Sequence, residues 1–159
     1  MNLQESFKAT GDVYIKVYDK DGKLKEAHAF KNRVVTTGKY YIANRLAGVS
    51  TGTVPVVGWM SIGTGNTSPA DGDTNLVTHA ARVALDSLTA TTTSNTVTAV
   101  ATFPAGTGTG DIKEAALFNY STYTASPSAT QMMLCRTTFP TVGKAAGDQI
   151  AITWQITIS

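Results

Sequence analysis

Residues 150–158 alternate strictly between apolar and more polar side chains, and this pattern constrains the fold more than any other feature. The apolar residues occupy every second position: Ile150, Ile152, Trp154, Ile156 and Ile158. Successive side chains of a β-strand point to opposite faces, so the segment predicts a strand with one face in a core. We therefore expect Trp154 to be a core residue.

Seven further segments carry strand signals and are separated by turns rich in Gly, Pro and Asp. They cover residues 12–18, 23–30, 56–62, 77–88, 95–103, 112–119 and 130–139. The turn Asp19-Lys20-Asp21-Gly22 joins the first two, and Gly22 can adopt a positive φ there, so we expect a β-hairpin. At the start of the fourth segment, residues 74–81 could instead form one helical turn.

Residues 37–47 form the only convincing helix pattern. Tyr41, Ile42 and Leu46 meet on one side at helical spacing, and Thr36 or Thr37 can cap the N-terminus. Gly48 suits the position just beyond the C-terminus. A helix this short is not stable alone, so it must pack on a sheet.

About eight strands and one short helix predict an all-β protein, a β-sandwich of jelly-roll type, because helices for parallel crossovers are lacking. The 159 residues fit a single domain, 1–159. Within it, residues 1–31 would form the N-terminal hairpin and an attachment element, and residues 32–159 the sandwich core. Only 15% of residues are charged, and the abundant Thr suits exposed strand positions.

The net charge of +2 is too small to indicate a nucleic-acid partner, but nine basic and five acidic residues fall within residues 1–45. This excess has two interpretations: a solvated hairpin with alternating Lys, or a surface that docks on an acidic partner. In the second, lysines and an arginine would steer the encounter, and aromatic residues would supply affinity. The candidate contact residues are Tyr14, Lys16, Tyr18, Lys23, Lys25, Phe30 and Arg33.

Catalytic signatures are lacking, and we assign no catalytic, cofactor or metal residues. The single cysteine, Cys135, lies in an apolar run far from His28 and His79, so we expect it to be buried. The loop that begins at Gly63 matches no phosphate-binding pattern. Asp111 and Glu114 should point to opposite faces of their strand, unlike a glycosidase pair.

Two further expectations concern cations and membranes. Asp71 and Asp73 could bind a hard cation weakly or could be solvated loop residues, and the sequence leaves this open. Residues 1–8 lack the apolar region of a signal peptide, and no stretch approaches the ~20 apolar residues that span a bilayer. We expect a soluble protein without membrane or nucleic-acid partners.

Several segments in a fixed order resemble a widespread group of small virion proteins of tailed bacteriophages. They are Asn32–Lys39, Met60–Ala70 with Asp73-Thr74, Ala101–Gly106, Ile112–Phe118, Met133–Phe139 and Gly147–Ile156. The resemblance covers roughly residues 30–159 and is strongest to capsid cement, or decoration, proteins of jelly-roll type. The hairpin at residues 12–30 is less typical of that group and is the segment that we interpret as a specific attachment element.

The resemblance implies a non-enzymatic structural protein that forms homo-oligomers and binds the major capsid protein. It would be made in the cytoplasm of a bacterial host and lie on the capsid exterior of the virion, with no cofactor and no small-molecule substrate. A tail, baseplate or tail-fibre component, which would bind other tail proteins, is the first alternative. A carbohydrate-binding or hydrolytic β-sandwich is the second.

Overall fold

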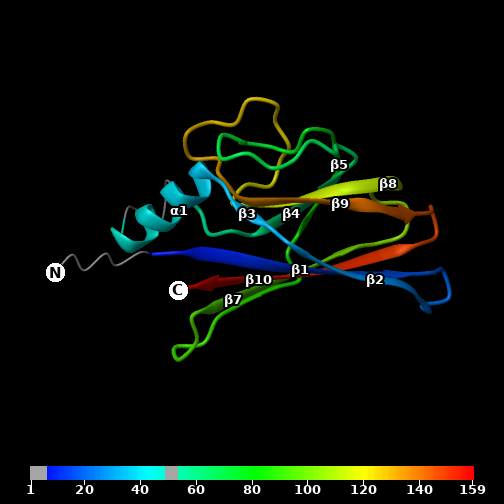
Figure 1. Ribbon diagram of the computed structural model, residues 1–159. Coiled ribbons are helices and arrows are strands. Elements are labelled where there is room, and N and C mark those ends of the chain that lie inside the picture. Colours follow the sequence, from blue (N-terminus) through cyan, green and yellow to red (C-terminus); the bar gives the residue numbers. More distant parts are fainter. Residues whose placement is uncertain (1–6, 49–53) are drawn as a thin grey trace.

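Two antiparallel sheets of five strands each lie face to face in the computed structural model, which describes residues 7–48 and 54–159 (Figure 1). Sheet A has the order β2 (Leu24–Lys31), β1 (Ala9–Tyr18), β10 (Gln149–Ile158), β7 (Thr96–Phe103) and β6 (Ser87–Thr89). Sheet B has the order β3 (Arg33–Val34), β9 (Met133–Lys144), β8 (Gly110–Phe118), β4 (Trp59–Gly63) and β5 (His79–Ala84). The all-β, sandwich-like arrangement agrees with the sequence analysis.

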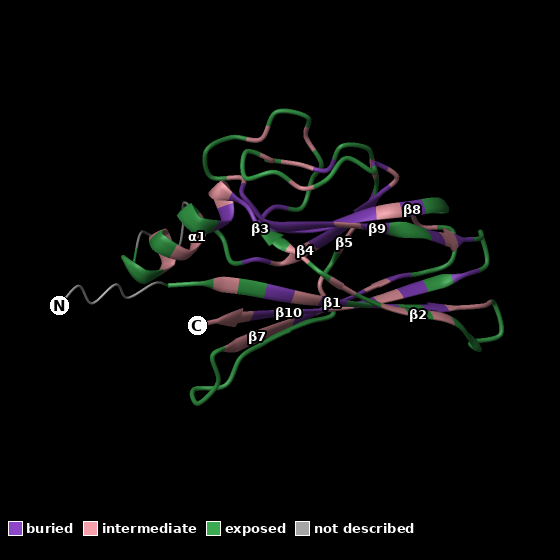
Figure 2. Ribbon diagram, in the orientation of Figure 1, coloured by how far each residue is buried: buried purple, intermediate pink, exposed green. Residues whose placement is uncertain are grey.

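The main core fills the space between the two sheets, whose facing sides are buried (Figure 2). Sheet A contributes the alternating residues Val13, Ile15, Val17, Ala99, Ala101, Phe103, Ile150, Ile152, Trp154 and Ile156. Sheet B contributes Met60, Ile62, Ala115, Leu117, Cys135 and Phe139 among others. Trp154 is 0% exposed, which confirms the core position that the alternation predicted.

The N-terminal hairpin belongs to sheet A along its whole length. β1 pairs with β10 from Ala9 to Tyr18 and with β2 from Asp12 to Tyr18, and Gly22 takes a positive φ of 77° in the turn. This confirms the predicted hairpin. Because β1 is an inner strand that supplies core residues, the hairpin shares its core with the rest of the chain.

Residues 77–88 correct the sequence prediction, because they form two strands in different sheets. β5 lies in sheet B and β6 in sheet A, and no helical turn precedes them. The chain crosses from one layer to the other between two adjacent residues. The Leu85 N–H donates to the Gly58 carbonyl on the side of sheet B, and the Asp86 N–H donates to the Val100 carbonyl in sheet A. The described residues thus contain ten strands rather than about eight, since β3 and β6 are too short to show alternation.

Helix α1 (Thr36–Leu46) lies within one residue of its predicted position at either end. The predicted cap is wrong, because Val35 precedes the first turn and no side chain caps it. Thr37 instead donates its hydroxyl to the Met133 carbonyl of β9 at 2.8 Å. Gly48 has a φ of 64°, as expected beyond a helix C-terminus.

The outer face of sheet B is covered, whereas that of sheet A is bare. Residues 64–78 and 119–132 pass over β8 and β9 (Figure 1). They enclose a second apolar cluster of Val35, Leu76, Ala116, Phe118, Tyr120 and Met133. No described segment crosses the corresponding face of sheet A, where the side chains are mostly half-buried or exposed (Figure 2).

Candidate functional site: the open face of sheet A

The outer face of sheet A is a broad surface with few charges. Tyr14, Lys16 and Tyr18 of β1 lie on it, because the intervening residues of β1 point into the core. Tyr14 pairs with Ala29 on one side and Thr153 on the other and is 41% exposed. The remaining positions are mostly small or uncharged: Thr10, Ala27, Ala29, Thr96, Thr98, Val100, Thr102, Ala151, Thr153, Gln155 and Thr157.

The charges on this face lie apart, with Lys16 of β1 toward β2 and Asp86, whose carboxylate accepts the Thr102 hydroxyl at 2.7 Å, toward β6. Asp12 of β1 is ion-paired with Lys31 of β2, whereas Lys16 makes no ion pair within the described residues. Lys23, at the hairpin, is likewise without an ion pair in this part of the chain. Two tyrosines beside an unpaired lysine can give apolar contact and attract an acidic surface.

Lys25 has a structural partner at the hairpin. Its Nζ donates to Asp148 Oδ2 at 2.6 Å, and the same carboxylate oxygen accepts the Ala145 N–H at 3.0 Å. The hydrogen bond from Lys25 lowers the pKa of Asp148 below its ordinary value, with the Ala145 N–H contributing next. Lys25 therefore ties β2 to the turn between β9 and β10.

Phe30 and Arg33 lie away from the other five candidate residues. Phe30 points between the sheets and stacks on Phe139, with 5.1 Å between ring centroids. Arg33 is in sheet B, where its Nε donates to Asp71 Oδ1 at 2.9 Å and lowers the pKa of that carboxyl group. The seven candidate residues therefore do not form one continuous patch.

A buried ion network under the loop of residues 64–78 escaped the sequence analysis. Arg136 and Glu114 are both 0% exposed, and the guanidinium donates from Nε and Nη2 to Glu114 Oε2 at 3.0 and 2.8 Å. The Glu114 carboxylate also accepts the backbone N–H groups of Gly65, Val77 and Thr78 at 3.1, 3.1 and 2.8 Å. The signal was present, because each is a charged residue beside an apolar run, Glu114 before residues 115–118 and Arg136 after residues 133–135.

The network also accounts for the two loop aspartates. Arg136 Nη1 donates to Asp73 Oδ2 at 2.8 Å, and Asp71 faces Arg33 instead. No group of three or more His, Cys, Asp or Glu side chains suited to a metal occurs in the described ranges. Both aspartates thus have arginine partners, so neither is simply a solvated loop residue.

Asp111 and Glu114 are separated as expected, since Asp111 is exposed and Glu114 is buried. Cys135 is fully buried, and this burial raises the pKa of its thiol, which keeps the sulfur protonated. The prediction of a buried cysteine is confirmed. No helix in the described segments is long and apolar enough to cross a bilayer.

Comparison with known proteins gives no relative for this chain: no family model, no curated protein and no solved structure matches it.

Proposed function

We propose that this chain is a non-enzymatic structural protein of a tailed-phage particle, and more specifically a decoration protein that binds the major capsid protein and stabilises the shell. The observation that carries the proposal is the contrast between the two outer faces. Sheet B is covered by its own loops, whereas sheet A presents a bare face with the exposed Tyr14, the half-buried Tyr18 and Lys16, which has no ion pair within the described residues. A bare, rigid face of this kind is suited to adhesion on a larger surface.

The composition of the face supports binding to a protein surface. Thr and Ala side chains lose little conformational entropy when a partner covers them, so the entropic cost of binding over this face is small. Lys16 would steer the protein to an acidic shell, and Tyr14 would supply apolar contact. Weak contacts of this kind gain strength when an oligomer makes several of them at once.

The finer fold assignment, a jelly roll, is part of the same proposal. In its support, β1 lies beside β10 in one sheet while β3 lies beside β9 in the other, so the early and late strands are neighbours in both layers.

A tail, baseplate or fibre component would use the same open face. Protein counting on purified particles separates the two, because decoration requires many copies over the shell and a tail component only a few.

The direct test is re-addition of purified protein to particles that lack it. Lys16→Glu and Tyr14→Ser should each reduce the bound copies several-fold without changing the circular dichroism spectrum. Lys20→Glu, at the tip of the hairpin turn, is the charge control. Tyr123→Ser is the aromatic control, since Tyr123 lies in the loops over sheet B with an exposed fraction of 40%, against 41% for Tyr14. Equal binding by all four variants, or absence of the protein from particles, would overturn the proposal.

A further inference from the structure

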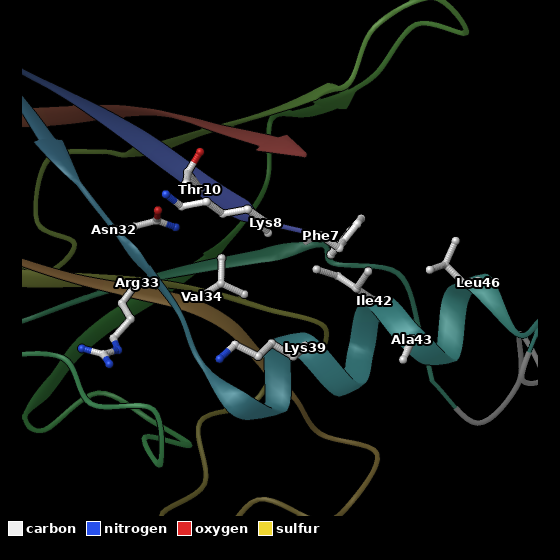
Figure 3. A pocket seen from close by; sticks show the side chains of 11 residues that line it. Phe7, Lys8, Thr10, Asn32, Arg33, Val34, Lys39, Ile42, Ala43 and Leu46 are labelled. Atoms are coloured by element: carbon white, nitrogen blue, oxygen red, sulfur yellow. The ribbon is translucent and has the colours of Figure 1, made fainter. Parts of the chain in front are cut away.

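A groove of about 590 Å³ separates helix α1 from the beginning of β1 (Figure 3). Asn32 lies at its narrow end, where the chain leaves sheet A for sheet B, and Phe7 and Leu46 lie at its wide end (Figure 3). The groove is distinct from the open face of sheet A, because it lies along the edge of β1 and not over the sheet.

The backbone of β1 is unpaired along this groove. β2 pairs with β1 only from Asp12 onward, while β10 pairs with β1 from Ala9 onward. Lys8 exchanges both backbone hydrogen bonds with Ser159, so by antiparallel alternation the N–H and C=O of Ala9 point the other way, into the groove. Within the described residues, nothing extends β2 along Ala9, and the next contact on that side is the Asn32 N–H to the Gly11 carbonyl.

The walls of the groove are apolar and its rim is basic. Ile42, Ala43 and Leu46 of α1 form one wall, and the Leu46 side chain is 80% exposed. Lys8, Arg33 and Lys39 line the groove, and among the described residues no acidic side chain does. Asp71 outside the groove pairs with Arg33 and lies 3.9 Å from Lys39, so its carboxylate faces two of these three cations.

A buried amide group lies at the narrow end of the groove. The side-chain Oδ1 and Nδ2 of Asn32 are buried and have no nitrogen or oxygen partner in the described structure. They pack beside Gly11 and the Cys135 thiol, so the amide closes this end of the groove and is not itself a contact for a ligand.

We propose that this groove binds an extended peptide segment of a partner protein, which adds to the edge of β1 as a further strand. Ala9 would supply the backbone hydrogen bonds, and Ile42 and Leu46 would contact the apolar side chains of the segment. Lys8 and Lys39 select acidic residues in it. The free edge runs from Phe7 to Thr10, because the Gly11 carbonyl already accepts the Asn32 N–H, and it accommodates an extended segment of about four residues. This inference goes beyond the proposed function, because it holds for any partner with such a segment.

The first test uses a fluorescent peptide of about eight residues in which Glu and Val alternate, with fluorescence anisotropy as the readout. We expect the matching Lys–Val peptide to bind about tenfold more weakly or not at all. Leu46→Glu and Lys39→Glu should each weaken binding of the acidic peptide at least several-fold. Because Leu46 is largely exposed, its replacement leaves the core intact. Lys16→Glu, on the open face of sheet A, is the charge-matched control and should bind normally.

The second test is hydrogen exchange of backbone amides in the presence of the acidic peptide. The Ala9 N–H should exchange at least tenfold more slowly, whereas the Thr10 N–H, which faces β10, should not change. Unaltered Ala9 exchange, or equal binding by the Leu46→Glu variant, would overturn the proposal. So would a dimer of the unliganded protein that Leu46→Glu dissociates, because a second copy would then occupy the groove. Failure here leaves the particle-binding result with Lys16→Glu unaffected.

Discussion

Arg136 and Glu114 illustrate how a buried charged pair can serve as a fastener between segments distant in sequence. The guanidinium joins Glu114 of β8 to Asp73 and to the Thr67 carbonyl, so two separate points of the covering loop are held by one side chain. Removal of one partner from such a pair leaves an uncompensated buried charge, which costs more than the pair itself contributes.

Arg136→Met should therefore lower the free energy of unfolding by about 3–5 kcal/mol, measured by urea denaturation. The double variant Glu114→Gln/Arg136→Met should recover part of this loss, because no charge is then left buried at residue 114 and the Gln amide oxygen can still accept the Gly65 and Thr78 N–H groups. Lys20→Met is the control, since the Lys20–Asp21 pair is 76% and 70% exposed and such pairs contribute under about 1 kcal/mol. A single variant as stable as the control would contradict the fastener role.

Trp154→Ala should destabilise the protein by about 3–5 kcal/mol, because the ring fills the space between the sheets. The indole Nε1 has no hydrogen-bond partner among the described residues, so Trp154→Phe forfeits no hydrogen bond and should cost distinctly less. Thermal and urea unfolding of both variants measure the difference. Unchanged stability of Trp154→Ala would mean that the ring is not a core residue.

The Lys25–Asp148 pair predicts a specific loss of stability in acid. The pKa of Asp148 is lowered by the Lys25 hydrogen bond, so its contribution is full above the unfolded pKa of about 3.9 and disappears as pH falls through the lower folded pKa. Asp148→Asn should therefore flatten the fall of the melting temperature below about pH 4. Asp111→Asn removes an exposed carboxylate that has no ion pair in the described structure, and should leave the slope unchanged.

At the scale of elements, the close packing of helix α1 on sheet B depends on one glycine. A Cβ on Gly38 would lie 1.9 Å from the Leu134 carbonyl oxygen of β9, which is backbone and cannot move aside cheaply. Gly38→Ala should thus destabilise by about 1–3 kcal/mol, although Ala is favoured over Gly by about 1 kcal/mol inside a helix. Gly72→Ala meets no atom within 4 Å and should be near neutral in the same denaturation assay. A stabilised Gly38→Ala would show that α1 does not pack this closely.

The long elements could be predicted from the sequence because their buried apolar residues recur at the period of a strand or a helix. Residues 150–158 and 12–18 are strands with the expected faces, and the helix predicted at residues 37–47 lies at Thr36–Leu46. β3 has two residues and β6 has three, too few for alternation to register. The helix cap failed because Thr37 found a tertiary partner, the Met133 carbonyl, which local sequence cannot reveal.

The candidate surface was only partly predictable for the same reason. Tyr14, Lys16 and Tyr18 share a face because spacing along one strand fixes their orientation. Phe30 and Arg33 depend on long-range partners, Phe139 and Asp71 respectively, which bring them elsewhere. The unpaired β1 edge in the groove arises where the chain passes from sheet A to sheet B after β2. The amino-acid composition does not indicate where such a crossing occurs.

At the scale of the whole molecule, the sheet order predicts a gradient of local stability. β1 and β10 are inner strands of sheet A, and β8 and β9 are inner strands of sheet B, whereas β2, β3, β5 and β6 are edges. Amides in the inner strands should exchange hydrogen only on global unfolding, and those in the edges should exchange faster by local opening. Mass-spectrometric exchange over time checks this order, and a β6 as protected as β10 would contradict it.

The pairing of Lys8 with Ser159 has a mechanical consequence. Tension applied at these two residues would pull β1 and β10 apart from one end, loading their perpendicular hydrogen bonds one after another, as in a zipper. Tension that enters through the broad surfaces would instead be shared by many bonds at once. The protein should therefore unfold at low force when it is pulled at residues 8 and 159, and should resist a higher force that is applied over the faces of its sheets.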